Sequence, residues 1–134
     1  MAGELILVVE DNERNLKLVR DLLQLKGFRT LEAETAQQGL TLAAEHAPRL
    51  ILMDVQLPDM DGVAALGRLR ADPHTSSIPV IALTAFAMKE DRERFINAGF
   101  HGYMAKPIDI KTFPDQVRAF IEQAAARAAE IVDS

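Results

Sequence analysis

Short aliphatic runs alternate with longer stretches of mixed polarity along the whole chain. Each run is too short for a helix and apolar on both sides, which is typical of a parallel strand buried on both faces of a sheet. The run at 28–33 is more polar than the others. The predicted strands are residues 5–9, 28–33, 50–53, 78–83 and 101–105.

The stretches between these runs repeat apolar residues at three- and four-residue spacing, as one face of a helix does. Asn12 and Thr35 are suited to cap the first two helices, and Gly27 and Pro48 to end them. The inner faces are predicted to comprise Leu16, Val19, Leu22 and Leu23 in the first helix, and Leu40, Leu42 and Ala43 in the second. Further helices are predicted at 63–69, at 89–97 and from about residue 112 to the alanine-rich end.

Five strands alternating with five helices predict an α/β fold, a doubly wound parallel sheet with helices on both faces in a three-layer sandwich. We take the flavodoxin-like strand order 2-1-3-4-5 by analogy with known doubly wound folds, because the residues alone do not fix it. In that order the first and third strands are neighbours, and a ligand crevice lies at their carboxyl ends.

The composition limits the class of protein. With 134 residues, 49% of them hydrophobic, the chain fits one domain with its own core. It has no cysteine, which excludes disulfides, a thiolate nucleophile and a cysteine-ligated zinc site. The net charge of −5 and the lack of a long basic run argue against direct nucleic-acid binding. Because there is no secretory signal and no apolar run of about 18 residues, we expect a cytoplasmic protein that does not bind membranes.

Residues that can handle phosphate or magnesium follow four of the predicted strands. Glu10, Asp11 and Asp54 would bring carboxylates together, and two such charges about 4 Å apart repel by roughly 4 kcal/mol at an effective dielectric of about 20. A Mg²⁺ ion would offset this repulsion, since it binds one or two carboxylates, waters and phosphate oxygens. Lys106 would add a fixed positive charge, and the Thr84 hydroxyl could hydrogen-bond a phosphoryl oxygen. The group is suited to taking a phosphoryl group onto a carboxylate.

With these motifs the sequence resembles the receiver domains of response regulators in two-component signalling. The resemblance covers about residues 4–123 and rests on V-V-E-D-N, L-I-L-M-D-V-Q-L-P-D-M-D-G, A-L-T-A and Y-M-A-K-P, in the family's order and spacing. The stretch T-A-F-A-M-K-E-D is closest to single-domain cell-cycle regulators, the alternative being a receiver cut from a hybrid histidine kinase. The resemblance implies a phosphoacceptor signalling module rather than an enzyme, one that assists its own phosphorylation and slow dephosphorylation. Residues 124–134 would form a helical extension or tail after a receiver domain at 1–123.

The resemblance also assigns roles to individual residues. Asp54 would accept the phosphoryl group from a phosphohistidine of a sensor kinase or phosphotransfer protein, with Thr84 and Lys106 holding that group. The implied Mg²⁺ ligands are Asp11, Asp54 and the backbone carbonyl of Gln56, with Glu10 acting through a water. The bond between Lys106 and Pro107 is expected to be cis, which would aim the lysine inward.

Tyr103 matches the aromatic switch residue of the family, which turns inward when Thr84 is drawn toward the phosphate. This movement would reshape the surface formed by the fourth strand, the following helix and the fifth strand, where a target protein binds. The chain would be a monomer or a phosphorylation-dependent dimer. The apolar contacts expected on that surface are Phe86, Ala87, Met88 and Met104.

Two features depart from the commonest family pattern. Glu10 stands where many members have aspartate, which keeps the charge but lengthens its reach. Gln56 and Phe86 lie two residues after Asp54 and Thr84, at positions that often govern how water reaches the acyl phosphate. We therefore expect dephosphorylation to be tuned in this chain, in a direction that the sequence does not fix.

An aspartate-nucleophile phosphatase is the nearest enzyme alternative, because residues 59–62 spell its D-x-D-G signature. That chemistry needs the first aspartate at the end of a buried strand, whereas Pro58 places Asp59 within a loop. Turn formation explains the motif better. The three histidines, His46, His74 and His101, show no metal-ligand spacing, and we expect them to be structural or on the surface.

Overall fold

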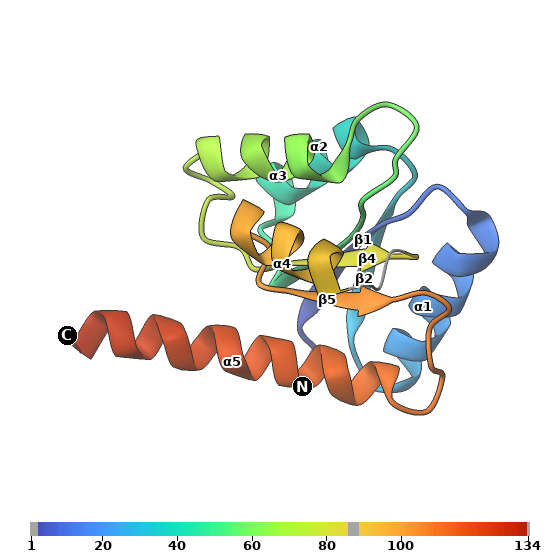
Figure 1. The fold of residues 1–134 in the computed structure, drawn as a ribbon. Helices are drawn as coiled ribbons and strands as arrows, with labels where there is room; N and C mark the ends of the chain where they lie inside the picture. Colours follow the sequence, from blue (N-terminus) through green and yellow to red (C-terminus); the bar gives the residue numbers. More distant parts are fainter. Residues whose placement is uncertain (1–2, 86–88, 134) are drawn as a thin grey trace.

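The fold is that of a computed structural model, which describes residues 3–85 and 89–133. One sheet of five parallel strands has the order β2-β1-β3-β4-β5, and a helix follows each strand (Figure 1). The predicted fold class and strand order are thereby confirmed. The elements are β1 (Leu5–Val9), α1 (Glu13–Leu25), β2 (Arg29–Ala33), α2 (Ala36–His46), β3 (Leu50–Asp54), α3 (Gly62–Ala71), β4 (Val80–Thr84), α4 (Lys89–Ala98), β5 (Gly102–Ala105) and α5 (Phe113–Asp133).

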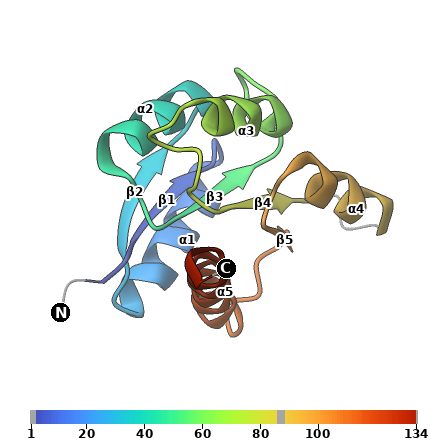
Figure 2. The same cartoon turned by 90° about the vertical axis from the view of Figure 1, so that its left-hand side faces the viewer.

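The sheet separates two apolar cores (Figures 1 and 2). Helices α1 and α5 cover one face, and α2, α3 and α4 cover the other. Successive residues of β1 alternate between the cores, with Ile6 and Val8 on the first side and Leu7 and Val9 on the second. Because both faces are covered, the central strands are aliphatic without interruption, which is the pattern from which they were predicted.

β4 begins two residues later than predicted. The N–H of Ile78 donates to the carbonyl of Thr75 at 3.1 Å in a turn, and Pro79 has no N–H, so the ladder starts at Val80. β2 and β5 each begin one residue later than predicted, while α3 and α4 extend beyond their predicted ranges.

The helix caps follow the sequence prediction. The side chain of Asn12 accepts hydrogen bonds from the backbone N–H groups of Arg14 and Asn15, and that of Thr35 accepts one from Gln38. Leu22, expected on the inner face of α1, packs against the core only in part.

Helix α2 contacts β1 through small residues, and its predicted inner face is correct only in part. A Cβ on Gly39 would lie 2.7 Å from Val9 Cγ2, so the helix lies too close to the sheet for a larger side chain there. Leu40 and Leu42 consequently sit at the side of the contact and are only partly buried. The buried residues are Ala36, Gly39 and Ala43.

Helix α5 is longer than the sheet it covers. Its buried anchors are near its start, and residues 122–126 are exposed or half-buried. The helix continues to Asp133 and projects beyond the body of the domain (Figure 1). Within the described part of the chain, no helix is long and apolar enough to cross a membrane.

Candidate functional site

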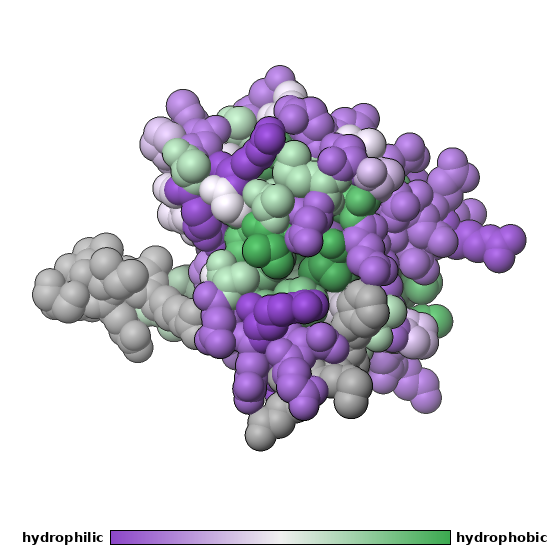
Figure 3. Space-filling model, turned by 45° about the horizontal axis from the view of Figure 1, so that its top comes forward, coloured by the Kyte–Doolittle hydropathy of each residue, from purple (hydrophilic) through white to green (hydrophobic). Residues whose placement is uncertain are grey.

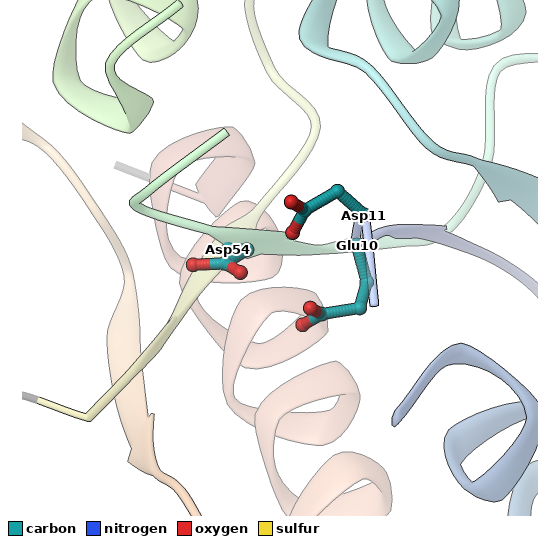
Figure 4. A group of neighbouring side chains, drawn as sticks. All are labelled: Glu10, Asp11 and Asp54. Atoms are coloured by element: carbon teal, nitrogen blue, oxygen red, sulfur yellow. The ribbon is translucent and has the colours of Figure 1, made fainter. Parts of the chain in front are cut away.

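Three carboxylates lie together at the carboxyl ends of β1 and β3. Glu10 and Asp11 follow β1, and Asp54 is the last residue of β3. Because Val9 and Met53 are paired in the register of these neighbouring strands, the residues after them lie side by side. One carboxylate oxygen of each acid lies within 4.8 Å of the other two, around one small space (Figure 4).

Lys106 brings a positive charge to this cluster from the end of β5. Its Nζ lies 2.8 Å from Asp54 Oδ2 and 2.7 Å from Glu10 Oε2. Its backbone N–H donates to the carbonyl of Thr84 at 2.8 Å, and the peptide bond to Pro107 is cis. One ammonium group thus bridges two carboxylates that come from different strands.

Burial and ion pairing act in opposite directions on these groups. Glu10 is 1% exposed, and this burial raises the pKa of its carboxyl by more than the hydrogen bond from Lys106 lowers it, with the charge of Asp54 adding to the rise. Burial also lowers the pKa of Lys106, but the hydrogen bonds to Asp54 and Glu10 outweigh it, so the pKa is raised overall. The lysine is therefore held in its charged form.

Backbone hydrogen bonds orient the two buried carboxylates. The N–H of Gln56 donates to Asp54 Oδ1 at 2.9 Å, while Oδ2 faces the lysine. The N–H of Asn12 donates to Glu10 Oε1 at 3.2 Å, while Oε2 faces the same ammonium. Asp11, in contrast, is exposed. Two carboxylates are thus fixed in place and the third faces solvent.

Thr84 and Tyr103 lie on the same face of neighbouring strands. Thr84 ends β4 and is 1% exposed, whereas Tyr103 of β5 is half-buried. The register pairs Tyr103 with Ala82 and Ala105 with Thr84, so all four side chains project to the side of α4. Only the methyl group of Ala82 stands opposite the tyrosine.

Arg92 on α4 binds the hydroxyl of Tyr103, a contact that the sequence analysis missed. Arg92 Nε donates to Tyr103 Oη at 2.8 Å, and Nη2 donates to the same oxygen. The guanidinium carbon also lies 4.7 Å from the centre of the tyrosine ring. No sequence signal marks this pair, because an arginine on a highly charged helix is ordinarily solvated.

Helix α4 is attached to the sheet by few side chains. Among residues 90–98, Phe95 is the buried one, and it packs edge-on against Phe100 with ring centres 5.9 Å apart. A groove of about 400 Å³ runs between α4 and the start of α3. Figure 3 shows apolar atoms at the centre of this face with polar side chains around them. The groove is lined by Val55, Gln56, Asp61, Val63, Arg94, Phe95 and Ala98.

Met104 is not on the surface where the sequence analysis placed it. It is 6% exposed and belongs to the core under α1 and α5. Successive strand residues point to opposite faces, so Met104 must face away from α4 if Tyr103 faces toward it. The other apolar contacts expected there, Phe86, Ala87 and Met88, lie outside the described residues.

The D-x-D-G motif caps two helices. Asp59 accepts hydrogen bonds from the backbone N–H groups of Ala36 and Gln37, at 2.9 and 3.0 Å, at the start of α2. Asp61 caps α3 by accepting from the N–H of Val63. The bonds from Ala36 and Gln37 lower the pKa of Asp59. This geometry agrees with the turn interpretation of the motif and gives the phosphatase alternative no support.

The histidines do not gather at a site. His46 and His74 each lie near an acidic neighbour in the sequence, and His101 Nδ1 is 3.3 Å from an Arg70 nitrogen. Among the described residues, the acidic side chains that are close enough together to hold a metal ion are Glu10, Asp11 and Asp54. Their all-oxygen donor set suits a hard divalent cation such as Mg²⁺.

The fold and the site define a class of signalling domain. The family model for the response regulator receiver domain matches residues 6–118. The chain therefore belongs to the receiver domains of two-component signalling, and the resemblance drawn from its motifs is confirmed.

Particular relatives place the chain more closely. It is 43% identical to the polar-differentiation response regulator DivK of Brucella ovis over 119 residues, which are 89% of this chain and 97% of that protein. The receiver domain of the sensor histidine kinase PA1611 from Pseudomonas aeruginosa PAO1, solved with a magnesium ion in its active-site cleft, is 35% identical with a TM-score of 0.82, covering 90% of this chain and 99% of that one. The CheY-like receiver protein of Methanospirillum hungatei JF-1 has a TM-score of 0.83 at 25% identity, over 93% and 98% of the two chains.

Proposed function

We propose that this receiver domain accepts a phosphoryl group on Asp54 from a phosphohistidine of a sensor kinase or a phosphotransfer protein. The observation that carries the proposal is the 2.8 Å pairing of Asp54 Oδ2 with Lys106 Nζ beside two further carboxylates. This places a nucleophilic oxygen next to a fixed positive charge, which phosphoryl transfer requires.

In the proposed reaction, Asp54 attacks phosphorus in line with the bond to the histidine nitrogen. The new O–P bond forms as the P–N bond breaks, and the imidazole leaves with the electron pair of that bond. Gln56 N–H holds one oxygen of Asp54 and so fixes the plane of the carboxylate. Lys106 offsets the charge that develops on the phosphoryl oxygens, and the Thr84 hydroxyl would hydrogen-bond one of them.

Asp11, Asp54 and the backbone carbonyl of Gln56 would hold Mg²⁺, with Glu10 contributing through a water. Three clustered carboxylates with a single lysine between them support this assignment, because one ammonium does not neutralise them. When bound, Mg²⁺ would stabilise negative charge on the phosphoryl oxygens.

The modification would switch the surface formed by β4, α4 and β5. Phosphorylation adds about −1.5 to −2 of charge beside Thr84, and a displaced Thr84 would let Tyr103 turn inward over the small Ala82. Thr84, Ala82 and Tyr103 project from the same face of the sheet, which supports this relay. The few buried side chains of α4 support movement of that helix, since weakly packed elements open most easily.

A kinase or phosphotransfer protein would supply the phosphoryl group, and a target protein would bind the switched surface. We take the receiver domain as residues 1–123 and residues 124–134 as a C-terminal helical extension or tail. A domain of a hybrid kinase would use the same site, and the 43% identity to DivK over 97% of that relative favours a DivK-like regulator.

Incubation with acetyl phosphate and Mg²⁺ tests the proposed acceptor. Intact-mass measurement should show one added phosphoryl group that hydroxylamine removes and that Asp54→Asn lacks. Asp59→Asn is the matched control, because Asp59 is a carboxylate nearby in sequence that caps a helix instead. An adduct that resists hydroxylamine, or one that persists in Asp54→Asn, would refute the proposal.

A further inference from the structure

The guanidinium of Arg92 contacts the side chain of Tyr103. It donates two hydrogen bonds to the tyrosine hydroxyl and lies 4.7 Å from the centre of the ring. Its helix is rich in carboxylates, yet the described residues give Arg92 no ion pair, and Asp91 pairs with Arg94 at 3.6 Å. Although acidic residues neighbour Arg92 in the sequence, its guanidinium contacts the phenol of Tyr103.

The contact joins the two elements that the proposed switch would move. Arg92 belongs to α4, which Phe95 attaches to the sheet, and Tyr103 belongs to the edge strand β5. An inward turn of the Tyr103 ring would change the position of its hydroxyl relative to Arg92. The hydrogen bonds from Arg92 must then break or carry α4 along.

We propose that Arg92 restrains Tyr103 in the unphosphorylated protein and so sets how much driving force the switch requires. The inference rests on the proposed function, because it assigns a residue that regulates the switch at Tyr103. Arg92 is a positioning residue, since it does not touch the phosphorylation site. A cation over an exposed aromatic ring is worth about 0.5–1 kcal/mol, which corresponds to an equilibrium shift of about two- to fivefold.

The sequence provides a direct probe, because Tyr103 is the one tyrosine of the chain and there is no tryptophan. Tyrosine emission therefore reports on this side chain alone. Beryllofluoride with Mg²⁺ imitates the phosphoryl group, and the change in emission during its titration gives a midpoint. Removing the restraint by Arg92→Ala should lower this midpoint about two- to fivefold relative to wild type.

Arg94→Ala is the matched control. It removes the same charge from the same helix, but Arg94 stacks on Phe95, 5.0 Å from its ring centre, and pairs with Asp91. Its midpoint should equal that of wild type. Arg92→Lys keeps the charge but loses the fork of N–H donors, so it should shift the midpoint in the same direction by less. Thermal unfolding checks that all variants are folded.

Acrylamide quenching of the unloaded proteins tests the contact separately. Arg92→Ala should expose the tyrosine ring, and Arg94→Ala should not. The proposed restraint would be overturned if Arg92→Ala showed increased quenching but an unchanged or higher beryllofluoride midpoint. It would also be overturned if quenching of Arg92→Ala equalled that of wild type. If beryllofluoride binds the wild type without changing its tyrosine emission, the switch role of Tyr103 in the proposed function fails instead.

Discussion

Lys106 Nζ lies 2.8 Å from Asp54 Oδ2, although 52 positions separate the two residues in the sequence. The contact passes over β4, which lies between β3 and β5 in the sheet. It forms because the carboxyl ends of parallel strands meet at one edge. The same ammonium also pairs with Glu10, so one cation offsets two buried carboxylates.

Loss of this cation should destabilise the fold. Lys106→Ala leaves Glu10 and Asp54 buried without a counter-charge, and we expect the free energy of unfolding at neutral pH to fall by about 3 kcal/mol. Urea unfolding in EDTA measures this change. Lys111→Ala removes an exposed lysine from the same connection and should change stability by less than about 0.5 kcal/mol. Equal losses in the two variants would contradict the prediction.

Because the pKa of Glu10 is raised, ionisation of its carboxyl should lower the free energy of unfolding as the pH rises. A carboxyl whose pKa is higher in the folded state stabilises the fold fully below its unfolded value of 4.5, and this contribution is lost as the pH rises through the folded pKa. Glu10→Gln cannot ionise, so its stability relative to wild type should increase from pH 4.5 toward neutrality. Urea unfolding in EDTA across this range measures the difference. Glu122→Gln, an exposed control on α5, should show no such trend, and neither should Glu10→Gln if the assigned direction is wrong.

Mg²⁺ should stabilise the protein through Asp11. A ligand at 100 times its Kd adds about 2.7 kcal/mol, which thermal unfolding detects as a higher Tm. Asp11→Asn should lose most of this shift, because Asp11 is the carboxylate of the cluster that faces solvent. Asp115→Asn, an exposed aspartate on α5, should keep it. If Mg²⁺ raised the Tm of Asp11→Asn as much as that of wild type, Asp11 would not be a ligand of the ion.

Two glycines of α3 should respond in opposite ways to alanine. A Cβ on Gly62 would lie 2.6 Å from the Cα of Val55, whereas one on Gly67 would meet nothing within 4 Å. Gly62→Ala should therefore lower the free energy of unfolding by about 1–3 kcal/mol. Gly67→Ala should raise it by about 0.5–1 kcal/mol, because alanine favours a helix. Equal stability of the two variants would show that the loop after β3 does not pass so close to this helix.

The sequence predicted the α/β class with its parallel strands, whereas the strand order, which brings the acidic cluster next to Lys106, was taken by analogy with known doubly wound folds. Continuous aliphatic runs identify buried parallel strands, and the carboxyl ends of such strands lie on one edge whatever separates them in sequence. Capping by Asn12 and Thr35 is likewise a local property. These features depend on the spacing of apolar residues and on the chemistry of residues close together in the chain, and both can be read from a single sequence.

Three features that escaped prediction depend on contacts between distant segments: the cap by Asp59, the small inner face of α2 and the Arg92 contact. Asp59 caps the start of α2 across 23 positions, and no local pattern marks that bond. The small inner face of α2 follows from how closely Gly39 approaches β1. The alternation of β5 should have placed Met104 opposite Tyr103, so that error came from neglecting the period of two. The Arg92 contact needed the position of α4 over β5.

The chemical location of the phosphoryl group tests directly whether Asp54 is the acceptor. Borohydride reduces an aspartyl phosphate to homoserine, and peptide mass spectrometry after treatment with acetyl phosphate and Mg²⁺ locates that residue. We expect homoserine at position 54 and at neither position 11 nor position 59. Homoserine at another position, or none in protein that carries the added phosphoryl mass, would contradict this expectation.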